Sequence, residues 1–295
     1  MGALRIWLMA ARPRTLPAAV APVLVGSAAA CALVDGDEFS WANFVAALIG
    51  AIFIQIGTNL ANDYSDAKRG ADTVDRLGPV RVTASGLAAP RRVLYATWAA
   101  FGIASLAGLY LTIEVGPEIL VIGVLSIAAG ILYTGGPKPY GYEGLGEIFV
   151  FVFFGLVAVN GSYYVQLQEL DALPIMLSLP IGLLSAAILV VNNVRDIDTD
   201  RRAGKRTLAV RIGRERTRVA YVAMIALSFL LLPVALLVGD GSAWGLLGLL
   251  SLPLAMGPIR AVRERTDGPA LNGALAGTGA LLGVFSLLAA AGLLL

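Results

Sequence analysis

Two clusters of oxygen-bearing side chains are the strongest candidates for chemistry in this chain. The first begins at Asn62 and the second at Asp196. Residues four positions apart share one face of a helix, so Asn62 pairs with Asp66, and Asp196 pairs with Asp200. Asp198, between the second pair, is expected to face away and to have a structural role. Each cluster therefore predicts a helix face that carries two oxygen ligands.

A divalent cation removes the repulsion between paired carboxylates. The chain has no His and a single Cys, Cys31, which excludes His-ligated metal sites, His-based triads and multi-cysteine clusters. Oxygen-only ligation predicts Mg²⁺, which is typically held by a few carboxylates and substrate phosphates. Cationic side chains that suit phosphate oxygens accompany both clusters: Arg69, Arg76 and Arg81 follow the first, and Arg195, Lys205 and Arg206 accompany the second. The mixture predicts a site for a Mg²⁺–diphosphate.

The alternative is that these charges are solvated loops that only set membrane topology, as charge runs usually do. Against it, the two clusters lie at the ends of two apolar segments that are four segments apart. That recurrence favours an internal duplication. We therefore expect one domain over 1–295, with the acid motif repeated at 62–72 and 192–200.

The composition predicts an all-α, multi-pass membrane protein. Hydrophobic residues make up 58% of the chain and charged residues 14%, with a mean hydropathy of +0.79, about half the charge of a soluble domain. The apolar residues form blocks of about the 20 residues that a helix needs to cross a bilayer. Nine such spans are expected, at 15–34, 41–61, 93–113, 117–134, 146–166, 172–194, 219–238, 242–259 and 269–294.

The distribution of positive charge orients these spans. All 22 Lys and Arg lie in the N-terminal arm and in every second connection. The positive-inside rule then places the N-terminus in the cytoplasm and, with nine spans, the C-terminus outside. Both acid clusters lie at cytoplasmic ends, of the second and sixth spans. We expect a plasma-membrane protein whose first apolar run is a span and not a cleaved signal.

Several segments together resemble the UbiA-type intramembrane prenyltransferases, a family of nine-helix bundles with two Asp-rich motifs. The resemblance covers nearly the whole chain, and within the family it is greatest to the branch that prenylates 1,4-dihydroxy-2-naphthoate in menaquinone biosynthesis. The segments that carry it are Asn62–Asp66 with Gly70–Asp72, Arg81–Gly86, Tyr133–Pro137, Gly144–Glu147 and Asn192–Asp196 with Ala203–Leu208.

The resemblance implies roles for individual residues. Asp66, Asp196 and Asp200 are the implied catalytic acids, and Tyr133 resembles a tyrosine that lines the family's active-site chamber. The implied metal ligands are Asn62, Asp63, Asp66, Asp72, Asp196 and Asp200, and the implied diphosphate-binding cations are Arg81, Lys138, Lys205, Arg206 and Arg69. Two places depart from the broader family: Gly70 replaces a third acid, for which Asp72 is interpreted as a substitute, and the spacing from Tyr133 to Lys138 is one residue longer.

The implied reaction is Mg²⁺-dependent transfer of a polyprenyl group from polyprenyl diphosphate to 1,4-dihydroxy-2-naphthoate. Diphosphate and CO₂ are lost, and the product is demethylmenaquinol. A membrane-spanning bundle suits a substrate whose tail stays in the lipid bilayer while its polyanionic head does not. Nothing indicates a nucleic-acid partner, and the sequence does not indicate an oligomeric state.

The acceptor is the most open part of this interpretation. Polar residues interrupt the fifth span, and polar groups at membrane depth usually face a cavity or the bundle interior, so Asn160, Ser162, Tyr163 and Tyr164 are candidates to bind the acceptor. Interhelical hydrogen bonding is an equal alternative for them. Within the family, 4-hydroxybenzoate, homogentisate, haem or glycerol-phosphate acceptors would use the same diphosphate site. A secondary transporter is less favoured, because no acidic residue falls in the middle of a span.

Overall fold

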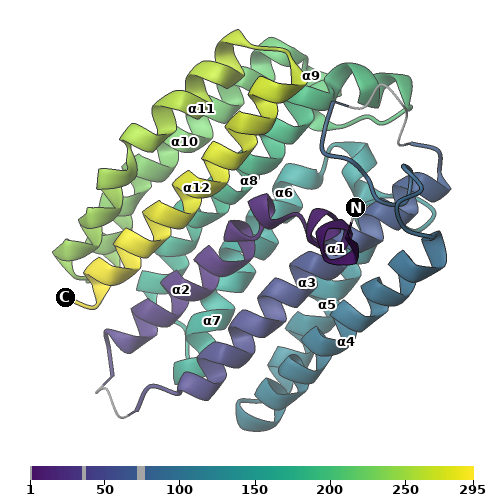
Figure 1. Cartoon of the computed structure of the whole chain (residues 1–295). Helices are drawn as coiled ribbons and strands as arrows, with labels where there is room; N and C mark the ends of the chain where they lie inside the picture. Colours follow the sequence, from purple (N-terminus) through teal and green to yellow (C-terminus); the bar gives the residue numbers. More distant parts are fainter. Residues whose placement is uncertain (1, 35–37, 72–76) are drawn as a thin grey trace.

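The computed structural model describes residues 2–34, 38–71 and 77–295, and every regular element in that part of the chain is helical. This confirms the predicted all-α fold (Figure 1). The long elements are α2 (Pro17–Cys31), α3 (Trp41–Lys68), α4 (Pro90–Glu114), α5 (Pro117–Leu132), α7 (Ala158–Leu167), α8 (Ala172–Arg202), α10 (Arg214–Val238), α11 (Pro253–Glu264) and α12 (Gly268–Leu293).

Short elements complete the chain between these helices. They are α1 (Ala3–Ala11), the 3₁₀ turns η1 (Pro13–Thr15), η2 (Tyr140–Glu143) and η4 (Ala243–Ser251), the helices α6 (Gly146–Val150) and α9 (Leu208–Ile212), and the π-helical segment η3 (Phe151–Val157). All nine predicted spans coincide with helical segments, the fifth with α6, η3 and α7 in succession. Among the described residues, six helices are long and apolar enough to cross a membrane, or up to eight if each of two bent pairs is one span.

Helix α8 lies at the centre of the larger part of the bundle. It packs against α10, α12, α2 and η3, and its buried face is rich in aliphatic residues such as Leu184 and Val191. Glycines allow the closest approach: a Cβ on Gly155 of η3 would lie 2.7 Å from the Cα of Gly182 in α8. Because α8 is held on several sides, the acid motif at its end is carried by a rigid element.

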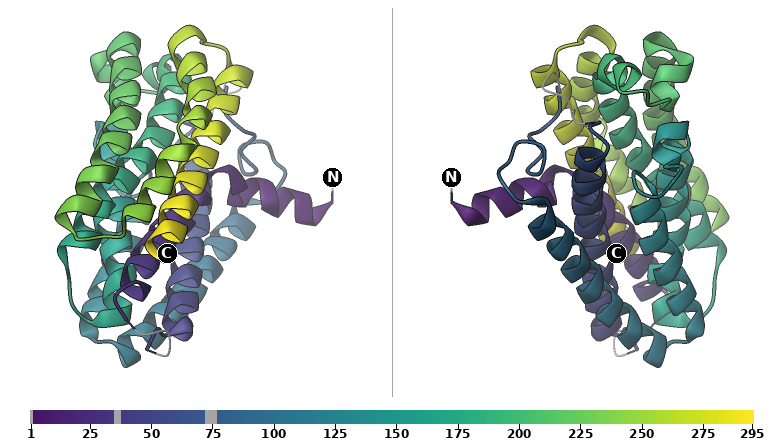
Figure 2. Two further views of the ribbon diagram at one scale, coloured as in Figure 1. Left: turned by 90° about the vertical axis from the view of Figure 1, so that its left-hand side faces the viewer. Right: turned by 90° about the vertical axis from the view of Figure 1, so that its right-hand side faces the viewer.

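Helix α3 forms a second layer with α4 and α5, beside α2 and α7 (Figure 1). Its first turn is capped by the Ser40 hydroxyl, which accepts a hydrogen bond from Asn43 N at 3.2 Å. Helix α1, which no apolar span predicted, leaves the side of the bundle as an arm (Figure 2). Met9 and Ala10 of this helix pack with Leu60 of α3 and Val82 of the following loop.

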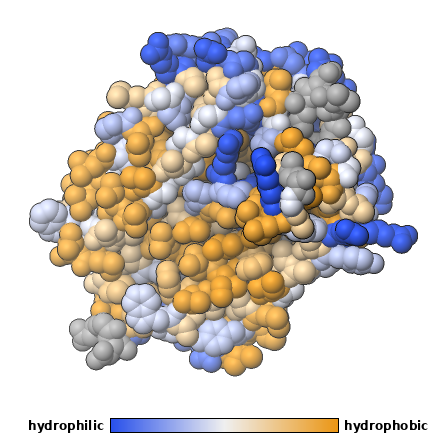
Figure 3. Space-filling view, viewed as in Figure 1, coloured by the Kyte–Doolittle hydropathy of each residue, from blue (hydrophilic) through white to orange (hydrophobic). Residues whose placement is uncertain are grey.

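Both helices that carry acid motifs continue beyond the predicted apolar spans, α3 to Lys68 and α8 to Arg202. They end at the same end of the bundle, near α9 and opposite the C-terminus (Figure 1). Hydrophilic side chains gather at that end, whereas hydrophobic side chains cover much of the flanks of the bundle (Figure 3). The two motifs are thus brought together at the polar end of an apolar bundle.

Candidate active site

A cavity of about 760 Å³ lies between the two layers, within the usual size range of ligand pockets. We call Asn62–Asp66 the first acid motif and Asp196–Asp200 the second acid motif. The structure brings both to this cavity, because Asn62, Asp66, Asp196 and Asp200 all line it. The spacing of four residues thus places each pair on one face, as expected.

Asp66 is the most heavily bonded acid at the cavity. Its side chain is 2% exposed and accepts a hydrogen bond from the Tyr142 hydroxyl at 2.6 Å. Arg81 and Lys205 approach its other oxygen, at 3.2 and 3.5 Å, and the Lys205 ammonium lies 4.6 Å from the centre of the Tyr142 ring. Asn62, one turn earlier, accepts a hydrogen bond from the Thr134 hydroxyl at 2.9 Å. Two cations and a phenol are therefore concentrated around one carboxylate.

Asp63 is also buried, but it does not line the cavity. Its two oxygens accept hydrogen bonds from the backbone N–H groups of Val82 and Thr83, at 3.0 and 2.9 Å. These bonds fix the loop that carries Arg81 and so hold that guanidinium next to Asp66. This is a different contact from the metal coordination that the resemblance implied for Asp63.

The second acid motif is built mostly from its own helix. Arg195 is fully buried and donates to both oxygens of Asp196, at 2.8 and 2.6 Å. The same guanidinium is held by Asn192 at 2.5 Å and by Asn272 of α12 at 2.7 Å. Asp198 faces away from the cavity, as expected, and is ion-paired with Arg214 at 2.7 Å.

Some predicted residues are not at the cavity. Asp72 lies outside the described residues. Lys138 and Arg206 are exposed and do not line the cavity, and Arg69, also exposed, donates to the carbonyl of Gly136 instead. Lys138 lies in the bent segment between α5 and η2. Of the predicted diphosphate-binding cations, the structure brings Arg81 and Lys205 to the cavity.

Four aromatic rings form a row on the cavity wall: Tyr133, Tyr140, Phe149 and Phe153. Successive ring centres are 5.4, 3.9 and 6.1 Å apart. The Tyr140 hydroxyl donates to the carbonyl of Ala129 at 2.9 Å. Burial raises the pKa of Tyr140 well above its ordinary value, so this ring stays neutral. The row offers π faces to a developing positive charge.

Of the four polar candidates in the fifth span, the structure brings Ser162 to the cavity. Asn160, Tyr163 and Tyr164 do not line the cavity, whereas Ala158, Gly161, Ser162 and Val165 do. Tyr163 is fully buried in the core, and Asn160 donates to Leu156 of its own helix at 2.8 Å. The π-helical segment η3 immediately precedes these residues.

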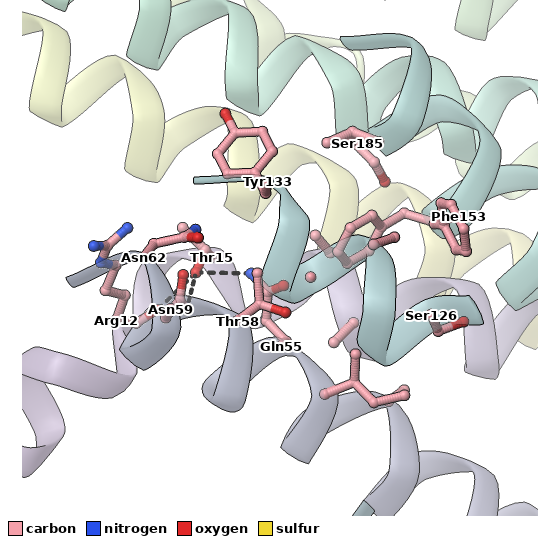
Figure 4. A pocket seen from close by; sticks show the side chains of 18 of the residues that line it. Arg12, Thr15, Gln55, Thr58, Asn59, Asn62, Ser126, Tyr133, Phe153 and Ser185 are labelled. Carbon is pink, nitrogen blue, oxygen red and sulfur yellow. Dashed lines mark hydrogen bonds between the residues drawn. The ribbon is translucent and has the colours of Figure 1, made fainter. Parts of the chain in front are cut away.

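Other cavity residues were not singled out from the sequence, notably Tyr142, Arg12, Gln55 and Asn59. Gln55 and Asn59 lie seven and three residues before Asn62, so the helical period alone could have placed them on the same face. No such signal exists for Tyr142 and Arg12, which are placed by turns. Figure 4 shows Arg12, Asn59 and Asn62 at one end of the cavity, with Phe153 and Ser126 at the other.

The donor set at the cavity fits a magnesium ion that is shared with a substrate. Within the described ranges, no group of three or more acidic, His or Cys side chains forms a closed metal site. The cavity instead offers the oxygen pairs of two helices, Asn62 with Asp66 and Asp196 with Asp200. Mg²⁺ commonly takes only one or two carboxylates from the protein and completes its shell with water and phosphate.

Comparisons with known proteins agree with this geometry. The model of the UbiA prenyltransferase family matches residues 19–274. The 1,4-dihydroxy-2-naphthoate octaprenyltransferase of Mycobacterium tuberculosis is 44% identical over 97% of this chain and 96% of its own length. That of Escherichia coli is 40% identical over 94% of this chain and 91% of its own length.

Solved structures share the fold at low sequence identity. A UbiA homologue from Archaeoglobus fulgidus bound to DMAPP and Mg²⁺ superposes with a TM-score of 0.64 at 14% identity, covering 97% of this chain and 99% of that one. The apo structure of a homologue from Aeropyrum pernix K1 gives 0.66 at 15% identity, covering 92% and 95%.

Proposed function

The chain belongs to the UbiA prenyltransferase family, and on that premise we propose that it transfers a polyprenyl group from polyprenyl diphosphate to 1,4-dihydroxy-2-naphthoate. The names of its relatives support this acceptor. The observation that carries the proposal is one cavity that joins both acid motifs to a long apolar wall. Such a cavity accommodates a polyanionic head at one end and an isoprenoid tail at the other.

The diphosphate is bound at the polar end. Asn62, Asp66, Asp196 and Asp200 would hold a Mg²⁺ ion shared with the diphosphate, and the ion would supply positive charge next to the departing oxygens. Arg81 and Lys205, already directed towards Asp66, donate to the same oxygens. Since the negative charge on these oxygens is larger in the transition state than in the bound substrate, these groups stabilise the transition state selectively.

The isoprenoid tail lies along the apolar wall formed by α4 and α5. Leu109, Leu120 and Val124 line the cavity and are 51, 52 and 58% exposed, so the cavity is open along this wall. A tail in this position passes from the cavity into the bilayer, so the enzyme does not have to extract its lipid substrate from the membrane.

The bond changes occur between these two ends. The carbon–oxygen bond of the allylic diphosphate breaks, and the apolar walls exclude water from the allylic cation. The aromatic row, Tyr133 to Phe153, offers it π faces. The electron-rich ring of the acceptor forms the new carbon–carbon bond. The bond between the ring and its carboxylate then breaks, and CO₂ leaves. The electron pair of the broken bond restores the aromaticity of the ring, and the product is demethylmenaquinol.

The reaction is tested with purified enzyme in liposomes, supplied with octaprenyl diphosphate, Mg²⁺ and dihydroxynaphthoate labelled in its carboxylate. Labelled CO₂ is expected in step with diphosphate and only when the allylic substrate is present. Excess EDTA should abolish both products, and added Mg²⁺ should restore them. A prenylated product that keeps the label, or rapid turnover of 4-hydroxybenzoate with inert dihydroxynaphthoate, contradicts the proposed acceptor.

We also propose nine membrane spans, with the active site open to the cytoplasm from the plasma membrane. The segregation of Lys and Arg supports this orientation. A variant without Cys31 that carries one new cysteine at Arg263 or at Asp240 tests it, because both positions are exposed. An impermeant thiol reagent added to intact cells should label position 240 and not 263, and the reverse result would invert the topology.

A further inference from the structure

The turn between α1 and α2 places a guanidinium at the cavity. The two helices are bent by 52° about this turn, where Pro13 and Pro17 interrupt the helical hydrogen bonds. Arg12 adopts a φ of 54°, a left-handed conformation that costs about 1 kcal/mol or more for a residue other than glycine. Its side chain lines the cavity. The surrounding structure must therefore hold the turn in this shape.

Two buried side-chain amides of α3, Gln55 and Asn59, hold the turn in this shape. The side-chain nitrogens of Gln55 and Asn59 each donate to the Thr15 hydroxyl oxygen at 3.2 Å, and Asn59 also donates to the carbonyl of Ala11 at 3.0 Å (Figure 4). The Thr15 hydroxyl in turn donates to the carbonyl of Arg12 at 3.0 Å. On the other side the turn touches α12, where a Cβ on Gly279 would lie 2.8 Å from the Arg14 carbonyl oxygen.

The turn is fixed deeper in the bundle than the first acid motif. Asn59 and Gln55 precede Asn62 by three and seven residues, which is about 4 and 10 Å along a helix at 1.5 Å per residue. Arg81 and Lys205 approach Asp66 itself, at the polar end. The turn that carries Arg12 is thus held at Gln55 and Asn59, between the diphosphate-binding end and the apolar interior, where the acceptor ring must lie to attack the prenyl carbon.

We propose that Arg12 binds the ring carboxylate of the aromatic acceptor, and that Gln55 and Asn59 are positioning residues for it. This inference rests on the proposed function, because it takes the acceptor to be an aromatic carboxylate. A guanidinium suits this ligand, since its planar donors match both carboxylate oxygens. The two amides that fix the turn are neutral, so they add no charge that competes with the carboxylate.

Two acceptors that differ only in the carboxylate test the assignment: 1,4-dihydroxy-2-naphthoate and 1,4-dihydroxynaphthalene. Arg12→Leu should raise the KM for the naphthoate about 10- to 100-fold, the range expected for losing a charge-assisted hydrogen bond. It should leave the KM for octaprenyl diphosphate and the kcat/KM for dihydroxynaphthalene within about threefold, because neither uses this contact. If the wild type does not prenylate dihydroxynaphthalene, its inhibition constant against the naphthoate is compared instead.

Variants around Arg12 separate binding from positioning. Arg12→Lys keeps the charge and should recover part of the naphthoate KM. Gln55→Leu should raise that KM with little change in kcat, whereas Arg91→Leu, at an exposed arginine of α4 that does not line the cavity, should change nothing by more than about threefold. Equal losses with both acceptors, or a raised KM for octaprenyl diphosphate in Arg12→Leu, would overturn the assignment. A wild type that prenylates a different acceptor refutes the proposed function instead.

Discussion

The two acid motifs share a spacing and a cavity, but they are held in different ways. The first is assembled from distant parts of the chain, since Asp66 contacts Arg81, Tyr142 and Lys205. The second is organised largely within α8, where Arg195 binds the neighbouring Asp196. The two oxygen pairs are similar, but only the first lies where loops and helices from distant parts of the chain meet. Substitutions should therefore affect folding and chemistry together in the first motif, and mainly chemistry in the second.

Asp66→Asn should have the largest effect. Turnover is expected to fall at least ~100-fold, as is common when a charged group at a transition state is lost. The variant should also melt earlier, because Arg81 and Lys205, which are 8 and 10% exposed, would lose their buried anionic partner. Turnover in liposomes and thermal unfolding in detergent measure the two losses. A near wild-type rate would remove Asp66 from the proposed metal site.

Asp196→Asn should separate the loss of turnover from the loss of thermal stability. Turnover is again expected to fall at least ~100-fold, but the melting temperature should change less than in Asp66→Asn. The reason is that Arg195 keeps its hydrogen bonds to Asn192 and Asn272 and can still donate to the amide oxygen. If both variants lose the same stability, the proposed difference between the motifs is incorrect.

Asp63→Asn tests the loop that belongs to the first motif. An amide can accept only one of the hydrogen bonds from Val82 and Thr83, and its nitrogen then faces the other N–H group. Leaving a buried donor unsatisfied costs about 1–3 kcal/mol, so we expect a lower melting temperature and faster proteolysis within residues 77–89. Turnover should fall about tenfold through the displaced Arg81, less than in Asp66→Asn. An unchanged cleavage rate in this loop would contradict the anchoring role.

The difference between contacts within one helix and contacts between distant parts of the chain also explains how much the sequence alone could predict. Asn62, Asp66, Asp196 and Asp200 were predictable because each pair lies within one helix, and the helical period fixes its face. The all-helical fold follows from apolar blocks of spanning length. The contacts of Tyr142 and Arg12 were not predictable, because they depend on turns that meet α3 from distant parts of the chain. Which of the polar residues of α7 lines the cavity was not predictable either, because polarity alone does not say which way a side chain faces, and of the four candidates only Ser162 lines it.

Asp198→Asn should have the smallest effect, although the residue lies between Asp196 and Asp200. Its side chain is 64% exposed and is ion-paired with Arg214 at 2.7 Å and with Arg201 at 4.0 Å. Exposed pairs of this kind contribute about 0–1 kcal/mol. Arg214 also keeps its hydrogen bond to the carbonyl of Val194 at 2.9 Å. We therefore expect turnover within about twofold of wild type and a change of at most a few degrees in melting temperature.

This variant removes one acid from the same helix and the same motif as Asp196→Asn, so it is the matched control for that substitution. If Asp198→Asn lowers turnover as strongly, loss of charge anywhere on the end of α8 is sufficient, and the cavity-facing pair has no special role. If it leaves turnover intact while Asp196→Asn abolishes it, the direction in which each carboxylate faces decides its function. The helical period, and not the local density of acids, then determines which residues of the second motif take part in the reaction.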